Sequence, residues 1–277
     1  MKEKLNGLFP ILLTPFSDSL KVDFDTLDKL VEYYRKSHVD GLTCLGEVSE
    51  VDLLDEEEKR SILQMVIEAV HGEMPVIAGA GRGSINSTKT AVEEAFSLGA
   101  SAALIPPPKI AALTGEEIYD YYVRLDDVSK GPIIILDNPS LGYPLISVDT
   151  VTRLVNDSRN IMGIKVEEQP SILKIVALRK SLGDGVSIYG ATHGRSLFWE
   201  MERGIDGVAD VDEALDFIRY YALNLIENEG FVRFTGKGYD NEESVSIMKP
   251  YGVFAVIPPF NFYAITVGMT VGPLITA

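Results

Sequence analysis

The sequence predicts a (β/α)8 barrel, the TIM barrel of the α/β class, followed by a C-terminal extension that is helical in part. Eight short apolar runs alternate with longer amphipathic segments within about 210 residues, and this count and length are typical of the barrel. Most of the runs are nearly continuous, as strands of a parallel sheet covered on both faces should be. A doubly wound sheet is the alternative, and only the count of eight argues against it.

The predicted strands are short and rich in β-branched residues. They cover residues 8–13, 41–45, 75–80, 101–105, 132–136, 161–165, 186–190 and 207–210. The C-terminal ends of such strands meet at one end of a barrel, where the active sites of this architecture are built.

The segments between the strands carry helix signals. Apolar residues recur at helical spacing after three residues that can begin a helix (Asp25, Asp55 and Ser147). Thr114 and Glu117 form a predicted capping box, in which each side chain satisfies an unpaired backbone donor. Gly183 stands where a further helix should end.

We assign residues 1–211 to the barrel and residues 212–277 to an extension that is packed on the barrel or in a subunit interface. The extension has a helix-like segment through residue 228, a glycine-containing loop over 230–243 and an uncharged tail over 251–277. The tail is long enough to cross a bilayer, but prolines interrupt it. This favours buried packing or a subunit contact.

Composition excludes several classes of protein. The chain has 277 residues, of which 25 are basic and 41 acidic, and its formal net charge is −16. Such a charge repels nucleic acids and anionic membrane surfaces. The single cysteine, Cys44, cannot form an internal disulfide, and the three histidines are too widely spaced for a metal site. Because we find no signal peptide, we expect a cytoplasmic protein without a metal ion or cofactor.

Lys165 is the most informative polar residue at the strand ends. It closes the apolar strand IMGIK, on the same side as Ile161 and Gly163. If that side faces the interior, the poorly solvated barrel mouth favours the neutral amine, which is the form that attacks a carbonyl. The alternative is a structural lysine paired with a carboxylate (Glu47, Asp137 or Glu167).

Two further features at the strand ends allow alternatives. The alternation of Asp137 with the preceding isoleucines allows it to point inward, where it could pair with Lys165 or move protons; otherwise it caps the turn that follows. The glycine-rich segment 190–196 leads from a strand into a helix, and its amides, with His193 and Arg195, favour a bound anion. The alternative is a turn without a bound ligand, because a strand-to-helix turn needs glycine and serine in any case.

Five segments carry a family resemblance. They are LFPILLTPF near the start, DGLTCLGEVSEVDLLDEEEKR, PVIAGAG, DNPSLG and NIMGIKVEE. In order and in spacing, over about residues 5–211, the sequence resembles the dihydrodipicolinate synthase and N-acetylneuraminate lyase family of Schiff-base lyases.

The resemblance implies that Lys165 forms an imine with the keto group of pyruvate or another 2-oxo acid. A protonated imine is an electron sink that stabilises a neighbouring carbanion. The resemblance also implies that the turn after the second strand holds the substrate carboxylate and that strands seven and eight line the same pocket. The substrate-binding residues so implied are Cys44, Leu45, Gly46, Glu47, Gly190 and Val208.

Positions that carry hydroxyl groups and relay protons in the family lack these groups here. Cys44 and Leu45 replace threonines, so only backbone amides remain to hold a carboxylate. Leu136 replaces the tyrosine of strand five, and PPPKIAAL lacks a tyrosine that usually crosses from a neighbouring subunit. An acidic pair, Glu167 and Glu168, follows the lysine, as in a divergent branch of the family. The candidates for a replacement acid or base are Asp137, Tyr143 and His193.

We therefore predict a Schiff-base-forming aldolase, lyase or dehydratase that acts on a pyruvate-like 2-oxo acid or a 2-keto-3-deoxy sugar acid. Lys165 forms the imine, and Asp137 or a bound water moves protons. The alternative is a barrel without turnover that binds a small oxo acid or sugar acid as a sensor, which the missing hydroxyls favour. The apolar tail and the resemblance both indicate a homo-oligomer, a dimer or tetramer.

Overall fold

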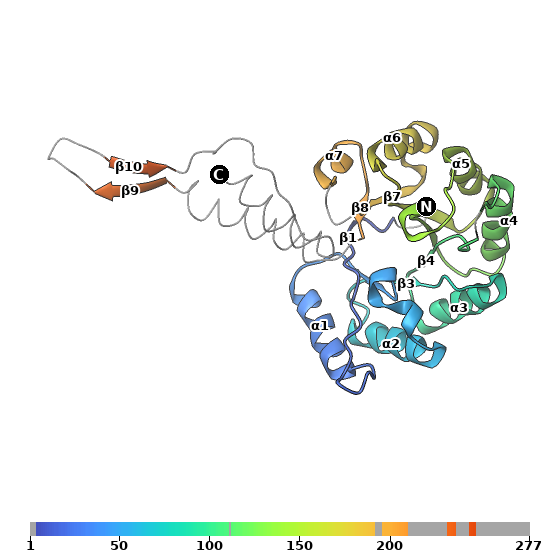
Figure 1. Cartoon of the computed structure of the whole chain (residues 1–277), viewed down its shortest axis with the longest axis horizontal. Helices are drawn as coiled ribbons and strands as arrows, with labels where there is room; N and C mark the ends of the chain where they lie inside the picture. The colour runs from blue at the N-terminus through green and yellow to red at the C-terminus, as the bar shows by residue number, and fades with distance from the viewer. Residues whose placement is uncertain (1–3, 111, 192–195, 210–231, 237–243, 248–277) are drawn as a thin grey trace. The chain divides into compact units, whose positions relative to one another are not determined.

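The computed structural model describes residues 4–110, 112–191, 196–209, 232–236 and 244–247. The chain divides into two compact units, Met1–Thr192 with Ser196–Asp210, and His193–Arg195 with Val211–Ala277. In the first unit, eight parallel strands form a nearly closed barrel inside a ring of helices (Figure 1). The predicted (β/α)8 fold is confirmed.

The barrel strands follow one another around the sheet in the order β1-β8-β7-β6-β5-β4-β3-β2. Their bounds are β1 Gly7–Leu8, β2 Leu42–Cys44, β3 Val76–Gly79, β4 Ala102–Ile105, β5 Ile133–Asp137, β6 Ile161–Val166, β7 Ser187–Gly190 and β8 Gly207–Val208. The segment after β1 closes the barrel, because Thr43 of β2 donates its N–H to the Pro10 carbonyl at 2.7 Å and forms an isolated bridge with Ile11.

The helices lie between successive strands. Their bounds are α1 Phe24–Lys36, α2 Glu56–Ala69, α3 Ile85–Leu98, α4 Gly115–Asp126, α5 Val148–Asp157, α6 Ser171–Leu182 and α7 Leu197–Glu202. Side-chain caps are present at three predicted starts (Asp55, Thr114 and Ser147). Gly183 ends α6 as predicted. The start of α1 differs from the prediction, because Asp23 rather than Asp25 is its cap.

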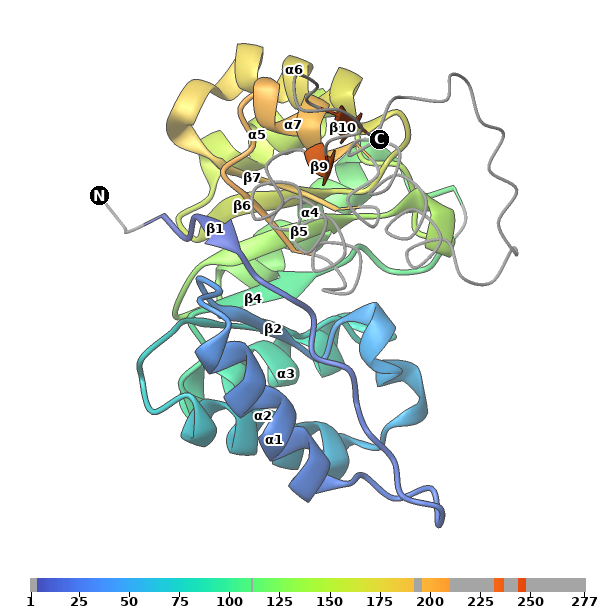
Figure 2. The same cartoon turned by 90° about the vertical axis from the view of Figure 1, so that its left-hand side faces the viewer.

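The two faces of the strands belong to separate cores. The interior core includes Ile77, Leu104, Ile134, Leu136 and Tyr189. Two outer cores pack the opposite strand faces against the helices, which lie above and below the strands in Figure 2. Successive residues of one strand therefore point into different cores, and this alternation decides which polar side chains reach the barrel mouth.

A register shift between β5 and β6 overturns part of one prediction. Ile133 pairs with Ile161, whereas the next residue, Ile134, pairs with Gly163. The extra residue in β6 changes the face on which the following side chains lie. Ile161 consequently lies in the outer core, while a side chain at Gly163 would contact Ile134 of the interior. The prediction that Ile161 shares a side with Lys165 is wrong.

The second unit has two described strands, β9 Val232–Gly236 and β10 Ser244–Ile247, which pair antiparallel. The loop predicted over 230–243 is wrong where β9 lies, and the alternation of apolar and polar residues in VRFT is the strand signal that the prediction missed. The predicted helix through residue 228 and the tail 251–277 lie outside the described residues. The boundary after residue 211 stays a prediction. Among the described helices, none has the length and apolar character needed to span a membrane.

Candidate active site

Lys165 points into the barrel interior near the C-terminal end of β6. Leu136 of β5 and Tyr189 of β7 flank it in register, and both belong to the interior core. Gly163, two residues earlier, faces the same core. The Lys165 side chain is only 6% exposed, so its amine is largely removed from water, as the sequence analysis required for a nucleophile.

A carboxylate is in direct contact with the Lys165 amine. Nζ of Lys165 lies 2.6 Å from Oε1 of Glu167, one of the three partners that the sequence left open. The other oxygen, Oε2, accepts a hydrogen bond of 2.7 Å from Nδ2 of Asn138. Oγ of Ser140 in turn donates to Oδ1 of Asn138 at 2.5 Å. The turn after β5 therefore holds the carboxylate that contacts Lys165.

Asp137 lies on the opposite face of β5 from Leu136. Of the two alternatives for Asp137, the inward orientation is wrong, because the preceding residues that share its side, Ile133 and Ile135, belong to the outer core. Its Oδ2 lies 2.7 Å from Nζ of Lys174 on α6 rather than beside Lys165. Burial raises the pKa of Asp137 to about 6, and the ammonium of Lys174 opposes this shift only in part.

The turn after β2 forms one wall of a cavity. Leu45 adopts a left-handed conformation with φ 58°, which directs its carbonyl toward β3. A Cβ on Gly79 would lie 1.9 Å from that carbonyl oxygen, so only glycine fits there. Cys44 points away into an outer core, where burial raises the pKa of its thiol to about 12. Only the backbone of Cys44 is therefore near the turn.

This cavity has a volume of about 860 Å³ and opens beside the ends of β2 to β5. Its lining includes Leu45, Gly46, Glu47, Leu136 and Tyr143. Lys165 does not line the cavity, but Leu136, its neighbour in register, does. The Tyr143 hydroxyl donates to Oε1 of Glu47, and burial together with this carboxylate raises the tyrosine pKa above its usual value.

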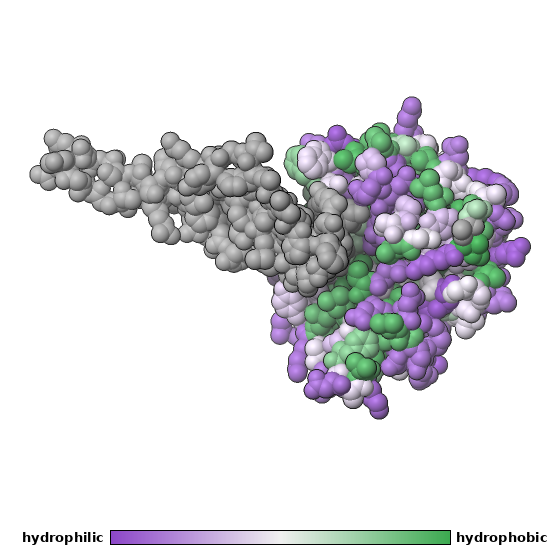
Figure 3. Space-filling view, viewed as in Figure 1, coloured by the Kyte–Doolittle hydropathy of each residue, from purple (hydrophilic) through white to green (hydrophobic). Residues whose placement is uncertain are grey.

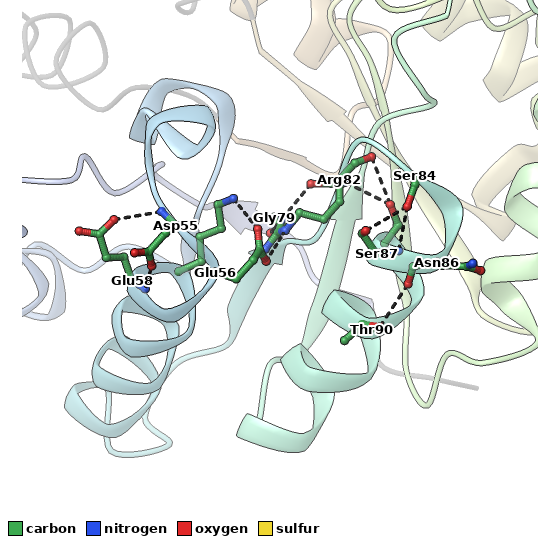
Figure 4. A network of polar contacts seen from close by, with 12 residues as sticks. Asp55, Glu56, Glu58, Gly79, Arg82, Ser84, Asn86, Ser87 and Thr90 are labelled. Carbon is green, nitrogen blue, oxygen red and sulfur yellow. Dashed lines mark hydrogen bonds and ion pairs between the residues drawn. The ribbon is translucent and has the colours of Figure 1, made fainter.

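The outer part of the cavity wall is a network of ion pairs (Figure 4). Nε of Arg82 lies 3.0 Å from Oε2 of Glu56 on α2, and the guanidinium also donates to the Gly81 carbonyl at 2.8 Å. Nζ of Lys59 lies 2.6 Å from the other oxygen of Glu56. Arg82 is therefore held by protein groups and ties the turn after β3 to α2.

Two other predicted site residues, Gly190 and Val208, make contacts elsewhere. A side chain at Gly190 would meet Glu200 of α7 at 2.3 Å, so its Cα faces that helix. The Val208 carbonyl accepts the Phe9 N–H at 2.8 Å and thereby joins β8 to the N-terminal segment. His193 lies outside the described residues. The structure thus brings together the β2 turn, Leu136 and the Lys165 region, and separates the Cys44 thiol and the Asp137 carboxylate from them.

A parallel eight-stranded barrel with a buried lysine at the C-terminal end of its sixth strand is the arrangement expected of a Schiff-base-forming enzyme of the class I aldolase type. The model of the dihydrodipicolinate synthetase family matches residues 4–220. The chain belongs to this family and is a lyase of that type. A second family model, that of the aldehyde dehydrogenase family, matches residues 204–277.

Individual relatives agree with this assignment. The chain is 29% identical over 208 residues to 4-hydroxy-tetrahydrodipicolinate synthase of Thermotoga petrophila, a match that covers 74% of this chain and 70% of the relative. It is 27% identical to the dihydrodipicolinate synthase structure from Aquifex aeolicus, with a TM-score of 0.72 over 81% of this chain and 75% of that one. For the Acinetobacter baumannii enzyme complexed with pyruvate, the identity is 25% and the TM-score 0.73, over 82% and 77% of the two chains.

Proposed function

We propose that Lys165 is the imine-forming residue and that the substrate is a pyruvate-like 2-oxo acid or a 2-keto-3-deoxy sugar acid. The observation that carries the proposal is the burial of this amine at the C-terminal end of β6, where the family's chemistry takes place. The amine attacks the substrate ketone, and loss of water leaves a protonated imine. This group draws electrons from the adjacent carbon, which allows a bond to that carbon to be made or broken.

The turn after β2 is suited to hold the substrate carboxylate. Within the described part of the chain, the N–H groups of Gly46 and Glu47 donate no hydrogen bond. Both residues line the cavity, so these donors can serve a carboxylate without any side-chain hydroxyl. The left-handed Leu45 and the missing Cβ of Gly79 together fix the path of this turn.

The second family match supports cleavage as the direction of the reaction. Cleaving a carbon–carbon bond next to the imine releases pyruvate and an aldehyde, and residues 204–277 match a family whose name describes aldehyde oxidation. A chain that joins the two sequences is consistent with a barrel that produces an aldehyde. Release of pyruvate and an aldehyde in equal amounts from a 2-keto-3-deoxy sugar acid tests this direction.

Borohydride trapping tests the proposed nucleophile. Incubation with pyruvate and sodium borohydride should add a reduced pyruvyl group to the peptide that contains Lys165. Lys165→Ala should lose the adduct, whereas Lys180→Ala, at the end of α6, should retain it. A wild-type protein without an adduct on Lys165 would contradict the proposal.

Turnover separates the enzyme from the sensor. We expect pyruvate release from at least one member of a panel of 2-keto-3-deoxy sugar acids, well above the Lys165→Ala control. Trapping without any turnover across the panel would favour a barrel that only binds its ligand.

The protein is further proposed to act in the cytoplasm as a homo-oligomer. Helices α6 and α7 expose apolar side chains, and hydrophobic patches interrupt the hydrophilic surface of the barrel unit in Figure 3. The most exposed on these helices are Leu173, Phe198, Trp199 and Met201. A second copy covering them would remove apolar area from water. Sedimentation should give a dimer or tetramer that Phe198→Glu weakens, and a monomer at all concentrations would refute this.

A further inference from the structure

The imine-forming site needs a group that moves protons, and neither barrel residue that flanks Lys165 in register is available for this. Leu136 carries only an apolar side chain, and the Tyr189 hydroxyl donates to the Leu5 carbonyl at 2.7 Å. Of the other candidates from the sequence, His193 lies outside the described residues, and two are engaged elsewhere. Asp137 pairs with Lys174 of α6, and the Tyr143 hydroxyl donates to Glu47. Neither contacts the Lys165 amine.

Glu167 lies in a position from which it can transfer protons to and from the Lys165 amine. It follows Lys165 by two residues, so the extended backbone brings both side chains to the same side. Its Oε1 lies 2.6 Å from Nζ of Lys165, within reach of direct proton transfer. Its side chain is 16% exposed, which limits competition from water.

The carboxylate is also held in a fixed orientation. Asn138 donates to Oε2 of Glu167 at 2.7 Å, and Ser140 donates to Asn138 at 2.5 Å. The Glu167 N–H donates to the Asp137 carbonyl at 2.9 Å, which anchors its backbone to the end of β5. The Asn138 amide thereby holds Oε2 of Glu167, while Oε1 stays in contact with the Lys165 amine. With one oxygen fixed by the amide, the carboxylate can exchange protons at the other oxygen alone.

We propose that Glu167 is the general acid and base of imine formation at Lys165, with Asn138 as its positioning residue. This inference rests on the proposed function. The carboxylate first takes a proton from the Lys165 ammonium, and the neutral amine adds to the substrate ketone. A proton moves from nitrogen to oxygen and gives a carbinolamine. Protonated Glu167 then donates its proton to the carbinolamine hydroxyl, which leaves as water. The products are the protonated imine, one water molecule and the regenerated carboxylate.

The test is the rate of pyruvate trapping in Glu167→Gln, a substitution that keeps the shape and the contact with Asn138. Removing a general acid or base lowers a rate by about 10² to 10⁴-fold, and we expect a loss in this range. Glu168→Gln is the matched control, because the neighbouring carboxylate pairs with Lys174 at 2.6 Å instead. It should trap pyruvate at the wild-type rate.

Further variants keep the test decisive if Glu167→Gln folds poorly. Glu167→Asp retains a carboxylate and should recover part of the trapping rate that Glu167→Gln loses, and Asn138→Ala should lower kcat more than it changes KM. The inference is overturned if Glu167→Gln, folded as judged by its unfolding curve, traps pyruvate within threefold of the wild-type rate. Wild-type protein that forms no adduct on Lys165 would instead overturn the proposed function, and this inference with it.

Discussion

Replacing Lys174 with methionine removes the cation of a buried charge cluster on the helix-facing side of β5. Nζ of Lys174 lies 2.7 Å from Asp137 and 2.6 Å from Glu168, and it also donates to the Ile146 carbonyl at 2.5 Å. The Asp137 side chain is fully buried. Without Lys174, this carboxylate has no cation within ion-pair distance among the described residues.

Breaking a buried pair by removing one partner costs about 3–5 kcal/mol, because an uncompensated charge stays behind. We expect the free energy of unfolding of Lys174→Met to fall by this amount at pH 8. Lys59→Met is the matched control, since Lys59 is also largely buried but its partner Glu56 is 66% exposed. A carboxylate left in water costs little, so the control should lose no more than about 1 kcal/mol of ion pairing.

The loss of unfolding free energy in Lys174→Met should be larger at high pH than at low pH. Burial raises the pKa of Asp137 to about 6 even with Lys174 beside it, and removing the ammonium raises it further. The folded variant then binds a proton that the unfolded chain releases above about pH 4, so its stability falls as the pH rises. At pH 5 the carboxyl is protonated, and the loss relative to wild type should be smaller than at pH 8.

Urea denaturation at both pH values measures these differences. Adding Asp137→Asn to Lys174→Met should recover most of the loss, because no buried charge remains. The reasoning is refuted if Lys174→Met loses no more stability than Lys59→Met, or if its loss is equal at pH 5 and pH 8.

Three further perturbations follow from single contacts. Gly79→Ala should lower the free energy of unfolding by at least about 1–3 kcal/mol and raise KM, since its Cβ would lie 1.9 Å from the Leu45 carbonyl oxygen. An unchanged KM together with an unchanged free energy of unfolding would contradict this. Cys44 should resist iodoacetamide at pH 8 until the protein is unfolded, because it is fully buried and its pKa is raised to about 12; intact-mass measurement checks this. Thr114→Ala should lower the free energy of unfolding by about 1 kcal/mol through loss of the capping box with Glu117, as thermal denaturation would show.

The inward orientation of Lys165 was predictable because a lone cation at the end of an apolar strand has few favourable environments. The same reasoning failed for Asp137. Both faces of a parallel barrel strand are apolar, so alternation along PIIIL cannot tell which face is interior. Only the assembled barrel shows that Ile134 and Leu136 face inward and that Asp137 faces α6.

Glu167 illustrates a different limit. In the sequence, Glu167 stands in an acidic pair with Glu168 and is one possible partner of Lys165, but it was not among the predicted proton carriers. Two adjacent carboxylates look equivalent in a sequence, yet they point to opposite sides of an extended chain. In the structure one contacts Lys165 and the other contacts Lys174. The signal in the sequence was the position of Glu167 two residues after the lysine, which places both side chains on the same side of an extended chain.

The two buried lysines of this region show why only one is suited to form an imine. Lys174 has three acceptors within 2.7 Å, two of them carboxylates, so its three donors are matched and its charge is stabilised. Lys165 contacts a single carboxylate among the described residues, and that carboxylate can accept its proton. Acceptors on every donor hold the Lys174 amine in place, whereas the Lys165 amine has one partner, which in the proposed mechanism takes its proton and returns it later. The number of acceptors around each amine therefore distinguishes the structural lysine from the proposed nucleophile more clearly than burial, which the two share.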